Sequence, residues 1–247
     1  MEERMKILDW LSPHTYKALY NEALGKRQTG TGIWFLKSPQ FENWVRGNLP
    51  TLYCFGIPGA GKTVLTSIAI EYLSSLECSG KLRVAYFFCN YQRQEEQKTE
   101  DILAAILRQL LEQYDQIPAS VYDLYHKSSR PSSDELFEIL SIIIGNQDRV
   151  YLIVDALDEC SGEVRKVLEK IRYLQDISKT SFMTTSRSID AVNKEFPSDS
   201  WFEIHARAAD VEMYLEDQLK YLPGCISNSR DVQQDVKKCI IDGIHGM

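Results

Sequence analysis

The sequence predicts an α/β protein in which a mainly parallel, five-stranded sheet lies between two layers of helices. Apolar segments of strand length alternate along the chain with segments whose apolar residues recur at helical spacing. Two strand-like segments, 82–90 and 149–155, are almost continuously apolar, which is typical of parallel strands covered on both faces. A third, 51–55, leads through a glycine-rich loop directly into an amphipathic helix. Such alternation predicts a three-layer arrangement.

The first part of the chain, 1–48, is expected to form a short helical extension. Apolar spacing, together with a proline at the start and a glycine at the end of the last segment, predicts helices over 5–11, 16–26 and 39–46. A loop punctuated by glycines, 27–32, runs into a short apolar segment between the second and third helices. Because this region is too small for a core of its own, we expect it to pack on the domain that follows.

The middle part, 49–207, is expected to form the core domain that carries the predicted sheet. Strands are expected at 51–55, 82–90, 149–155, 181–185 and 201–205. Helices are expected at 61–76, from 99 onward, and at 119–126, 136–144, 163–175 and 190–196. Ser132 and Glu135 have capping-box spacing before one of them. Helices near 210–222 and 230–244 are expected to begin a truncated helical subdomain over 208–247.

Composition restricts the function classes. With 247 residues, 44% of them hydrophobic and 26% charged, the chain is long enough for one large domain. A formal net charge of −7 argues against a general nucleic-acid or anionic-membrane partner. The sequence shows neither a signal peptide nor an apolar run of about 18 residues. Its six cysteines have no C-x-x-C spacing, and Cys54 and Cys89 fall in apolar runs as buried thiols do. We therefore expect a reduced, cytoplasmic protein.

The loop after the first strand has the pattern of a phosphate-binding loop. It reads GIPGAGKT and fits G-x-x-x-x-G-K-[ST] at each fixed position. Its glycines let backbone N–H groups surround a phosphate, and the next helix directs its positive end to the same anion. Lys62 would reach the outer phosphates and Thr63 would ligate Mg²⁺. The alternative is a Gly/Pro turn with a solvated lysine. The predicted nucleotide-binding residues here are Gly56, Ile57, Pro58, Gly59, Ala60, Gly61, Lys62, Thr63 and Val64.

A second motif places carboxylates beside this loop. The apolar run 150–154 ends in Asp155, and a parallel strand would deliver that carboxylate to the sheet edge where ligands bind. Asp155 is therefore predicted to hold Mg²⁺ together with Thr63, directly or through water. Asp158 and Glu159 follow, and either is a candidate to polarise the attacking water. The alternative is a solvated acidic loop, although clustered carboxylates repel one another unless a cation or a chemical role holds them.

A third motif, 184–187, ends the next predicted strand. In P-loop ATPases with an added strand, this strand lies between the two strands that carry the other motifs. Arg187 would then face the γ-phosphate and sense or stabilise its charge, which makes it a catalytic candidate beside Asp158 and Glu159. From the residues alone, capping of a helix or a surface ion pair is an equal alternative for Arg187.

Together the three motifs, GIPGAGKT, VYLIVDALDEC and FMTTSR, resemble the NACHT group of signal-transduction ATPases, an NLR-like class. Ala156 and the paired acids at 158 and 159 match that group's form of the second motif. Upstream, ILDWLSP, RQTGTGIWFL and FENWV resemble the fungal branch, whose members act in nonself recognition and programmed cell death. The resemblance implies a P-loop NTPase three-layer sandwich of the additional-strand type.

The resemblance also implies a ligand and a way of working. The ligand would be ATP or ADP with Mg²⁺, hydrolysis would be slow, and the triphosphate state would self-associate. GTP stays possible, although the nearest match to the guanine motif N-K-x-D, at 193–196, lacks the aspartate. Thr31 and Gly32 would lie near the base and ribose. The implied partners are the effector and sensor domains of a longer parent protein, with no nucleic acid and no membrane.

A nucleotide-dependent oligomerisation switch with weak hydrolase activity is thus the leading interpretation, and two others stay open. A ring-forming remodelling ATPase would need an arginine finger at a neighbour's interface, for which Arg172 and Arg207 are candidates. A nucleotide-binding structural module that hydrolyses almost nothing would carry the same motifs.

Overall fold

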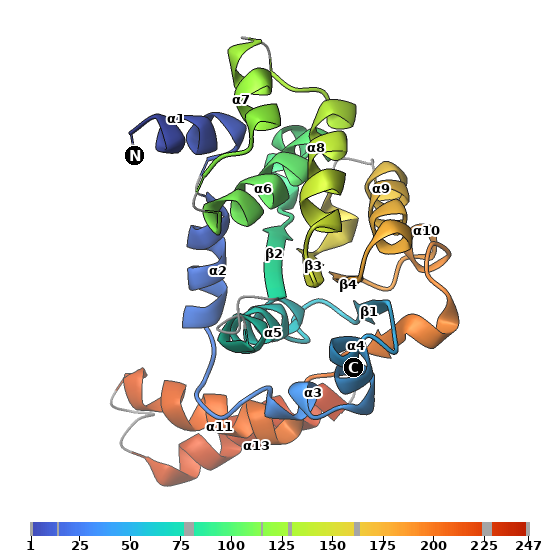
Figure 1. The fold of residues 1–247 in the computed structure, drawn as a ribbon. Helices are drawn as coiled ribbons and strands as arrows, with labels where there is room; N and C mark the ends of the chain where they lie inside the picture. The colour runs from blue at the N-terminus through green and yellow to red at the C-terminus, as the bar shows by residue number, and fades with distance from the viewer. Residues whose placement is uncertain are drawn as a thin grey trace.

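The computed structural model describes residues 2–13, 15–76, 82–114, 116–127, 130–160, 164–223 and 229–245. Its centre is one five-stranded sheet in the order β2-β3-β4-β1-β5, and neighbouring strands run parallel (Figure 1). The strands are β1 (Thr51–Phe55), β2 (Leu82–Phe88), β3 (Arg149–Asp155), β4 (Thr180–Ser186) and β5 (Trp201–Glu203). The predicted fold class is confirmed, as is the position of β4 between the two other motif strands.

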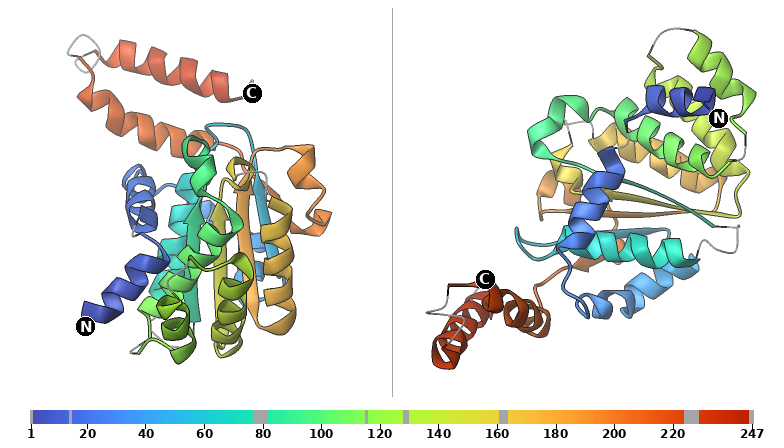
Figure 2. Two further views of the ribbon diagram at one scale, coloured as in Figure 1. Left: turned by 90° about the horizontal axis from the view of Figure 1, so that it is seen from above. Right: turned by 90° about the vertical axis from the view of Figure 1, so that its left-hand side faces the viewer.

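Alternate residues of each inner strand enter two different hydrophobic cores, because successive side chains point to opposite faces of a sheet. In β3, Val150, Leu152 and Val154 pack in one core, whereas Tyr151 and Ile153 pack in the other. Helices lie on both faces of the sheet, as Figure 2 shows. The apolar sequence of β3 is therefore buried on both sides.

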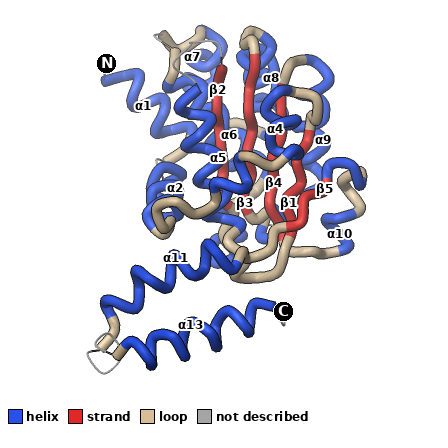
Figure 3. Tube along the Cα trace, turned by 90° about the horizontal axis from the view of Figure 1, so that it is seen from below, coloured by secondary structure: helices blue, strands red, loops and turns tan. Residues whose placement is uncertain are grey.

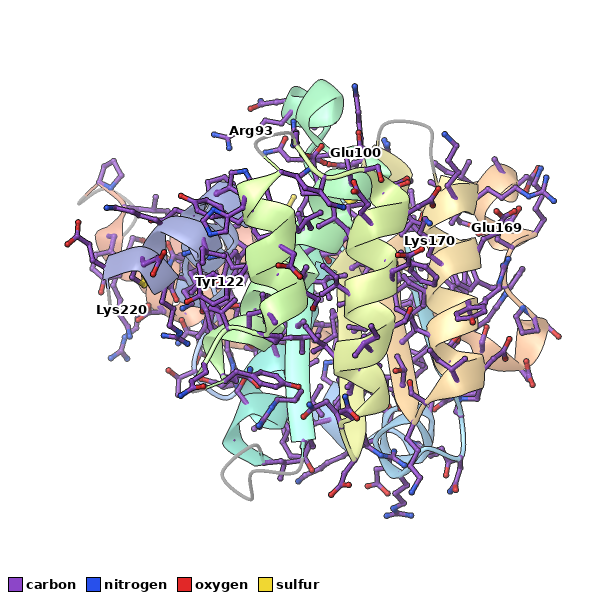
Figure 4. The ribbon with its side chains drawn as sticks, turned by 45° about the horizontal axis from the view of Figure 1, so that its top comes forward. Arg93, Glu100, Tyr122, Glu169, Lys170 and Lys220 are labelled. Carbon is purple, nitrogen blue, oxygen red and sulfur yellow. A yellow bond between two sulfur atoms is a disulfide. The ribbon has the colours of Figure 1, made fainter. Side chains whose placement is uncertain are left out.

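One face of the sheet is covered by three long helices, with two shorter helices packed outside them. These are α6 (Thr99–Glu112), α8 (Ser133–Gly145) and α9 (Val164–Ile177), then α1 (Glu2–Leu11) and α7 (Ala119–His126). The predicted capping box forms at α8, where Ser132 Oγ accepts the N–H of Glu135 and the Glu135 carboxylate accepts the N–H of Ser132. Lys170 lies between α9 and α8 (Figure 4), where its Nζ is 2.8 Å from Asp134 Oδ1.

The other face is covered by α5 (Lys62–Leu76), α4 (Pro39–Arg46) and α3 (Ile33–Leu36). Buried Trp44 of α4 donates from Nε1 to the backbone oxygen of Phe182 at 2.9 Å, which joins this helix to β4. Helix α2 (Thr15–Gly25) packs against both α5 and β2. Because β2 is an outer strand, α2 covers an edge that would otherwise be open to pairing.

Two helices near the C-terminus, α11 (Ala208–Gln218) and α13 (Arg230–His245), form a hairpin that lies apart from the sheet (Figure 3). In the described part of 208–245, the buried hydrophobic residues are Leu215 and Leu219. The remaining elements are α10 (Asp190–Asn193) and the 3₁₀ helices η2 (Tyr91–Glu96), η3 (Leu157–Glu159), η4 (Ser198–Ser200) and η5 (Leu219–Tyr221). No helix in the described ranges is long and apolar enough to cross a bilayer.

Candidate functional site

The loop with the phosphate-binding pattern joins β1 to α5 at the carboxyl edge of the sheet. Gly61 has φ +89°, a left-handed conformation that glycine adopts without steric cost. A Cβ at Gly56 would lie 2.4 Å from the backbone oxygen of Ile204, so the chain can pass the end of β5 only with glycine there. These glycines allow the sharp turn that brings the N-terminus of α5 to the sheet edge.

Lys62, the first residue of α5, folds back over the loop. Its Nζ donates to the backbone oxygens of Gly56 and Ile57, each at 2.8 Å. Partial burial lowers the pKa of Lys62, while the carboxylates of Asp158 and Asp155 act in the opposite direction. Lys62 thus binds two neutral carbonyl oxygens in this structure. Its hydrogen bonds to a charged phosphate would be stronger than these.

The Asp155 carboxylate, at the end of β3, accepts three hydroxyl hydrogen bonds. Thr63 donates to Oδ2 at 2.7 Å, and Thr66 and Thr185 donate to Oδ1 at 2.8 and 2.6 Å. Asp155 is 2% exposed, and this burial raises its pKa although the hydroxyl hydrogen bonds act against the shift. The two residues predicted to bind the metal, Thr63 and Asp155, are thus in direct contact.

These residues fit a magnesium ion that is shared with a phosphate. Mg²⁺ keeps several waters and is usually bound through one or two carboxylates plus substrate phosphates. Within the described ranges there is no cluster of three or more His, Cys, Asp or Glu side chains that would hold a metal alone. The hydroxyl of Thr63 and the carboxylate of Asp155 supply the small oxygen donor set that a shared site requires.

Thr66 and Thr185, for which no role was predicted, both donate hydrogen bonds to Asp155. Thr66 lies three residues after Thr63, so helical spacing puts the two hydroxyls on one side of α5. That spacing is a usable signal once Thr63 has been identified. Thr185 comes from β4, which pairs with β3, and its Oγ1 also accepts the N–H of Ala156 at 2.8 Å. Thr185 reaches Asp155 because β4 lies beside β3, and the motif alone does not predict that strand order.

The buried Asp155 carboxyl predicts a pH-dependent stability of the ligand-free protein. Its pKa is raised in the folded state, so its stabilising contribution is present at low pH and is lost as pH rises through the folded pKa. We therefore expect Asp155→Asn to gain melting temperature relative to wild type as the pH rises above the ordinary aspartate pKa of about 3.9, measured in EDTA.

Asp134→Asn is the matched control for this measurement, with the opposite sign. The hydrogen bond from Lys170 lowers the pKa of Asp134, so its stabilising contribution is present above the unfolded pKa and lost on acidification. That variant should therefore be destabilised only at the higher pH. A pH-independent difference between Asp155→Asn and wild type would contradict the prediction.

Asp158 and Arg187 bind each other. Arg187 donates to Asp158 Oδ2 from Nε at 2.5 Å and to Oδ1 from its backbone N at 3.2 Å. The Asp158 side chain is 3% exposed and that of Arg187 is 50% exposed, so a buried carboxylate holds the arginine at the rim of the site. The ion pair that the sequence analysis left as an alternative for Arg187 is present in this structure.

Glu159 takes a different position from its neighbour Asp158. Its Oε2 accepts the N–H of Tyr91 at 3.1 Å. It also lines a cavity of about 270 Å³ to which Thr63 and Asp155 contribute. Of the two acids that the sequence left undecided, Glu159 is therefore the one that shares a cavity with the predicted metal residues.

A second cavity, of about 340 Å³, adjoins the phosphate-binding loop. Thr31 and Gly32 line it together with the loop residues 59–61 and apolar side chains of α5. Trp34 and Arg207 line it as well, and the Arg207 guanidinium lies 4.0 Å from the centre of the Trp34 ring. The residues predicted to lie near the base thus share one cavity with the glycines of the loop.

One carboxylate oxygen joins this cavity to the C-terminal helices. Asp210 lies in the first turn of α11, and its Oδ2 accepts the N–H of Gly32 at 3.0 Å and the Nε1–H of Trp34 at 2.9 Å. The Thr31 hydroxyl donates to the backbone oxygen of Gln28 at 2.7 Å. The N–H of Gly32, predicted to lie near the base, is therefore bound to Asp210 in this structure. No sequence pattern had identified Asp210.

Both arginines considered as arginine fingers have partners within the chain. Arg172 donates to the backbone oxygen of Glu195 at 2.6 Å, and Arg207 lies on Trp34. These contacts use the side chains that a ring-forming ATPase would need at its interface. They do not favour the remodelling alternative.

Cys89 is buried as expected, but the expectations that it is a thiol and that the protein is fully reduced are wrong. Cys89 follows β2 and forms a disulfide with Cys160, which follows η3. The two are 71 residues apart in sequence and meet because β2 and β3 are adjacent parallel strands, which cysteine spacing does not reveal. Cys54 is a buried free thiol, as predicted. Cys78 and Cys225 lie outside the described residues.

Comparisons with known proteins agree with this architecture. Residues 30–187 match the family described as "Nephrocystin 3, N-terminal". The vegetative incompatibility protein HET-E-1 of Podospora anserina is 29% identical over 147 residues, which cover 56% of this chain and 11% of that protein. The Aeropyrum pernix ORC1 protein, solved in complex with DNA, aligns in fold with a TM-score of 0.50 and 17% identity over 74% of this chain and 48% of its own. The chain thus spans a small part of the fungal relative.

Proposed function

Because the chain belongs to the nephrocystin 3 N-terminal family and carries a P-loop nucleotide-binding domain of NACHT type, we propose that it binds a nucleoside triphosphate with Mg²⁺ and hydrolyses it slowly. One observation carries this proposal: Thr63 and Asp155, from two separate motifs, meet at 2.7 Å beside the phosphate-binding loop. The proposed triphosphate is ATP, whose hydrolysis leaves ADP, and GTP is the alternative triphosphate.

On binding, the loop residues 56–64 surround the phosphates with their backbone N–H groups. Lys62 leaves the carbonyls of Gly56 and Ile57 for the outer phosphates. Thr63 and Asp155 would hold Mg²⁺, which would supply neutralisation of phosphate charge there. The base enters the larger cavity, beside Thr31 and Gly32.

For hydrolysis we assign the orientation of the attacking water to Glu159, because it lines the same cavity as the metal residues. Asp158 keeps Arg187 at the rim of the site, from which the guanidinium can turn to the γ-phosphate and stabilise its charge. Glu159 must first leave the N–H of Tyr91, to which it is bound in this structure. This requirement is consistent with the slow turnover that we propose.

The proposed role of this activity is a switch. A base that hydrogen-bonds to Gly32 competes with Asp210 for the same N–H, so nucleotide exchange changes the attachment of α11 and α13. Self-association in the triphosphate state would then couple to the effector and sensor domains of a longer cytoplasmic protein. The likeness to a fungal vegetative incompatibility protein supports a role in nonself recognition.

One observation favours a second candidate, a module that binds nucleotide with almost no hydrolysis. Both acids of the motif are engaged, Asp158 by Arg187 and Glu159 by Tyr91. If those bonds persist in the nucleotide complex, neither carboxylate reaches a water molecule. A comparison of phosphate release by wild type and by Glu159→Gln separates the two candidates.

Asp155→Asn tests the binding site itself. In wild type, Mg²⁺ should strengthen ATP binding measured by calorimetry. The variant should bind ATP without metal as wild type does. Its gain in ATP affinity on adding Mg²⁺ should be smaller than that of wild type by about tenfold or more, because it lacks the carboxylate. Asp148→Asn is the matched control, since Asp148 is an exposed aspartate just before the opposite end of β3. An undiminished Mg²⁺ effect in Asp155→Asn would refute the site.

A further inference from the structure

The Cys89–Cys160 disulfide lies at the edge of the proposed hydrolytic site. Cys89 is the first residue after β2, and its N–H donates to the backbone oxygen of Asp155 at 3.0 Å. Cys160 directly follows Glu159. The Cα atoms of the two cysteines are 5.7 Å apart. The bond therefore crosses from the end of β2 to the acidic loop that follows β3.

This disulfide restrains the acidic loop together with two other contacts. Arg187 of the β4 end binds Asp158, and Cys89 of the β2 end binds Cys160. Glu159 lies between these attachments and accepts the N–H of Tyr91, two residues after Cys89. The Cys89–Cys160 disulfide and the Tyr91–Glu159 hydrogen bond thus join the same two segments, the chain after β2 and the acidic loop after β3.

The disulfide borders a cavity through Cys89 although both cysteines are mostly buried. Cys89 is 7% and Cys160 is 5% exposed, but Cys89 lines the cavity that also contains Asp155 and Glu159. A small oxidant or reductant can therefore reach the bond through the site. The free cysteines differ from this pair, because Cys54 is fully enclosed in β1 and Cys239 is exposed on α13.

A purely stabilising role accounts poorly for this position. Structural disulfides are typical of small domains that cannot bury a sufficient core. This chain has two extensive hydrophobic cores, one on each face of its sheet. The bond joins two loops at the site edge, where it adds restraint to Glu159.

We propose that Cys89 and Cys160 are a reversible thiol–disulfide pair that controls hydrolysis through Glu159. The oxidised pair keeps Glu159 on the N–H of Tyr91, and reduction frees the acidic loop so that Glu159 reaches the attacking water. The phosphate-binding loop is not part of this linkage, so nucleotide affinity stays the same in both states. This inference rests on the proposed hydrolysis, whereas the chemistry of the pair is independent of it.

The oxidant class that fits is a small hydroperoxide. The thiolate of one cysteine attacks the peroxide oxygen, which breaks the O–O bond, forms a sulfenic acid and releases an alcohol or, from hydrogen peroxide, water. The second thiol then attacks the sulfenic sulfur, which forms the S–S bond and releases water. Two thiols are oxidised by two electrons, the peroxide is reduced, and both thiol protons end on the released oxygens. A dithiol reverses the step by exchange.

The first test follows the thiols and not the activity. The full chain is treated with hydrogen peroxide or with dithiothreitol, alkylated with N-ethylmaleimide, and each cysteine is scored by peptide mass spectrometry. Cys89 and Cys160 should lose and regain alkylation together, while Cys239 should stay modifiable after mild peroxide treatment. Independent behaviour of Cys89 and Cys160, or resistance of the pair to dithiothreitol in native protein, would overturn the proposal.

The second test measures phosphate release and ATP affinity of the same two preparations. The reduced protein should hydrolyse ATP about tenfold faster or more, since a small displacement of a catalytic group has effects of that size or greater. Calorimetric affinity should not change. Cys89→Ser should be active and insensitive to peroxide, and Cys239→Ser, the control, should respond as wild type does.

The outcomes separate this inference from the proposed function. Equal hydrolysis by oxidised and reduced wild type, with the pair shown to cycle, overturns the control of Glu159. Absence of ATP binding in both states, with the pair still cycling, overturns the proposed function and with it the regulatory role. The comparison of wild type with itself does not depend on whether Cys89→Ser folds.

Discussion

Lys62→Ala should weaken ATP binding by about 100-fold, because a hydrogen bond from a charged group contributes about 1.5–3 kcal/mol and each 1.4 kcal/mol is a factor of ten. In the ligand-free protein, Lys62 donates only to the backbone oxygens of Gly56 and Ile57. Ile57 is exposed and Gly56 is buried, so the variant loses one hydrogen bond to a buried residue and should lose little stability. The loss should therefore appear in affinity and hardly in melting temperature.

Lys179→Ala is the matched control for this measurement. Lys179 is exposed and precedes β4, at the end of the sheet opposite to the phosphate-binding loop. Calorimetric titration with ATP and Mg²⁺ should give wild-type affinity for this variant. An unchanged affinity in Lys62→Ala, in protein that melts like wild type, would show that the loop does not bind the triphosphate.

Glu159→Gln should reduce phosphate release by about 10²- to 10⁴-fold, the range that a positioned acid or base contributes. Glutamine has the size of glutamate and keeps an oxygen that can accept the N–H of Tyr91. It cannot accept a proton from water. ATP affinity should therefore stay at the wild-type value while single-turnover hydrolysis falls.

Two further variants complete this experiment. Glu138→Gln, on the exposed side of α8, is the control and should hydrolyse ATP as wild type does. Asp158→Asn tests the other acid, whose ion pair with Arg187 would weaken. A large loss in Asp158→Asn with normal activity in Glu159→Gln would assign the water to Asp158. Equal phosphate release by all four proteins would favour the non-hydrolysing module.

The fold was predictable because its signals are local. Strand β3 is a continuous apolar run bounded by polar residues, and helix α8 begins at a capping box that four residues define. The proximity of Thr63 and Asp155 was predictable too, since carboxyl ends of parallel strands meet at one sheet edge. In each case a short motif carries the signal, and the parallel sheet brings Thr63 and Asp155 together although they are 92 residues apart.

The contacts of Asp210 and of Cys89 were not predictable, because each joins segments far apart in the chain and involves residues outside the three motifs. Asp210 reaches Gly32 across 178 residues, and Cys89 reaches Cys160 across 71. The direction of the acidic loop depends on Ala156, which has φ +53° although alanine rarely adopts it. That turn brings Asp158 to Arg187, so the ion pair follows from a backbone conformation that no pattern indicates.

The attachment of α11 at Asp210 has a mechanical consequence. The eleven residues of α11 extend about 16 Å at 1.5 Å per residue, so a rotation of about 20° at its first turn moves its far end by about 6 Å. That displacement is roughly twice the length of either hydrogen bond to Asp210. Under the proposed switch, the hairpin of α11 and α13 would work as a lever with its pivot at the base cavity, and the exchange of one acceptor at Gly32 would become a movement large enough to rearrange a protein surface.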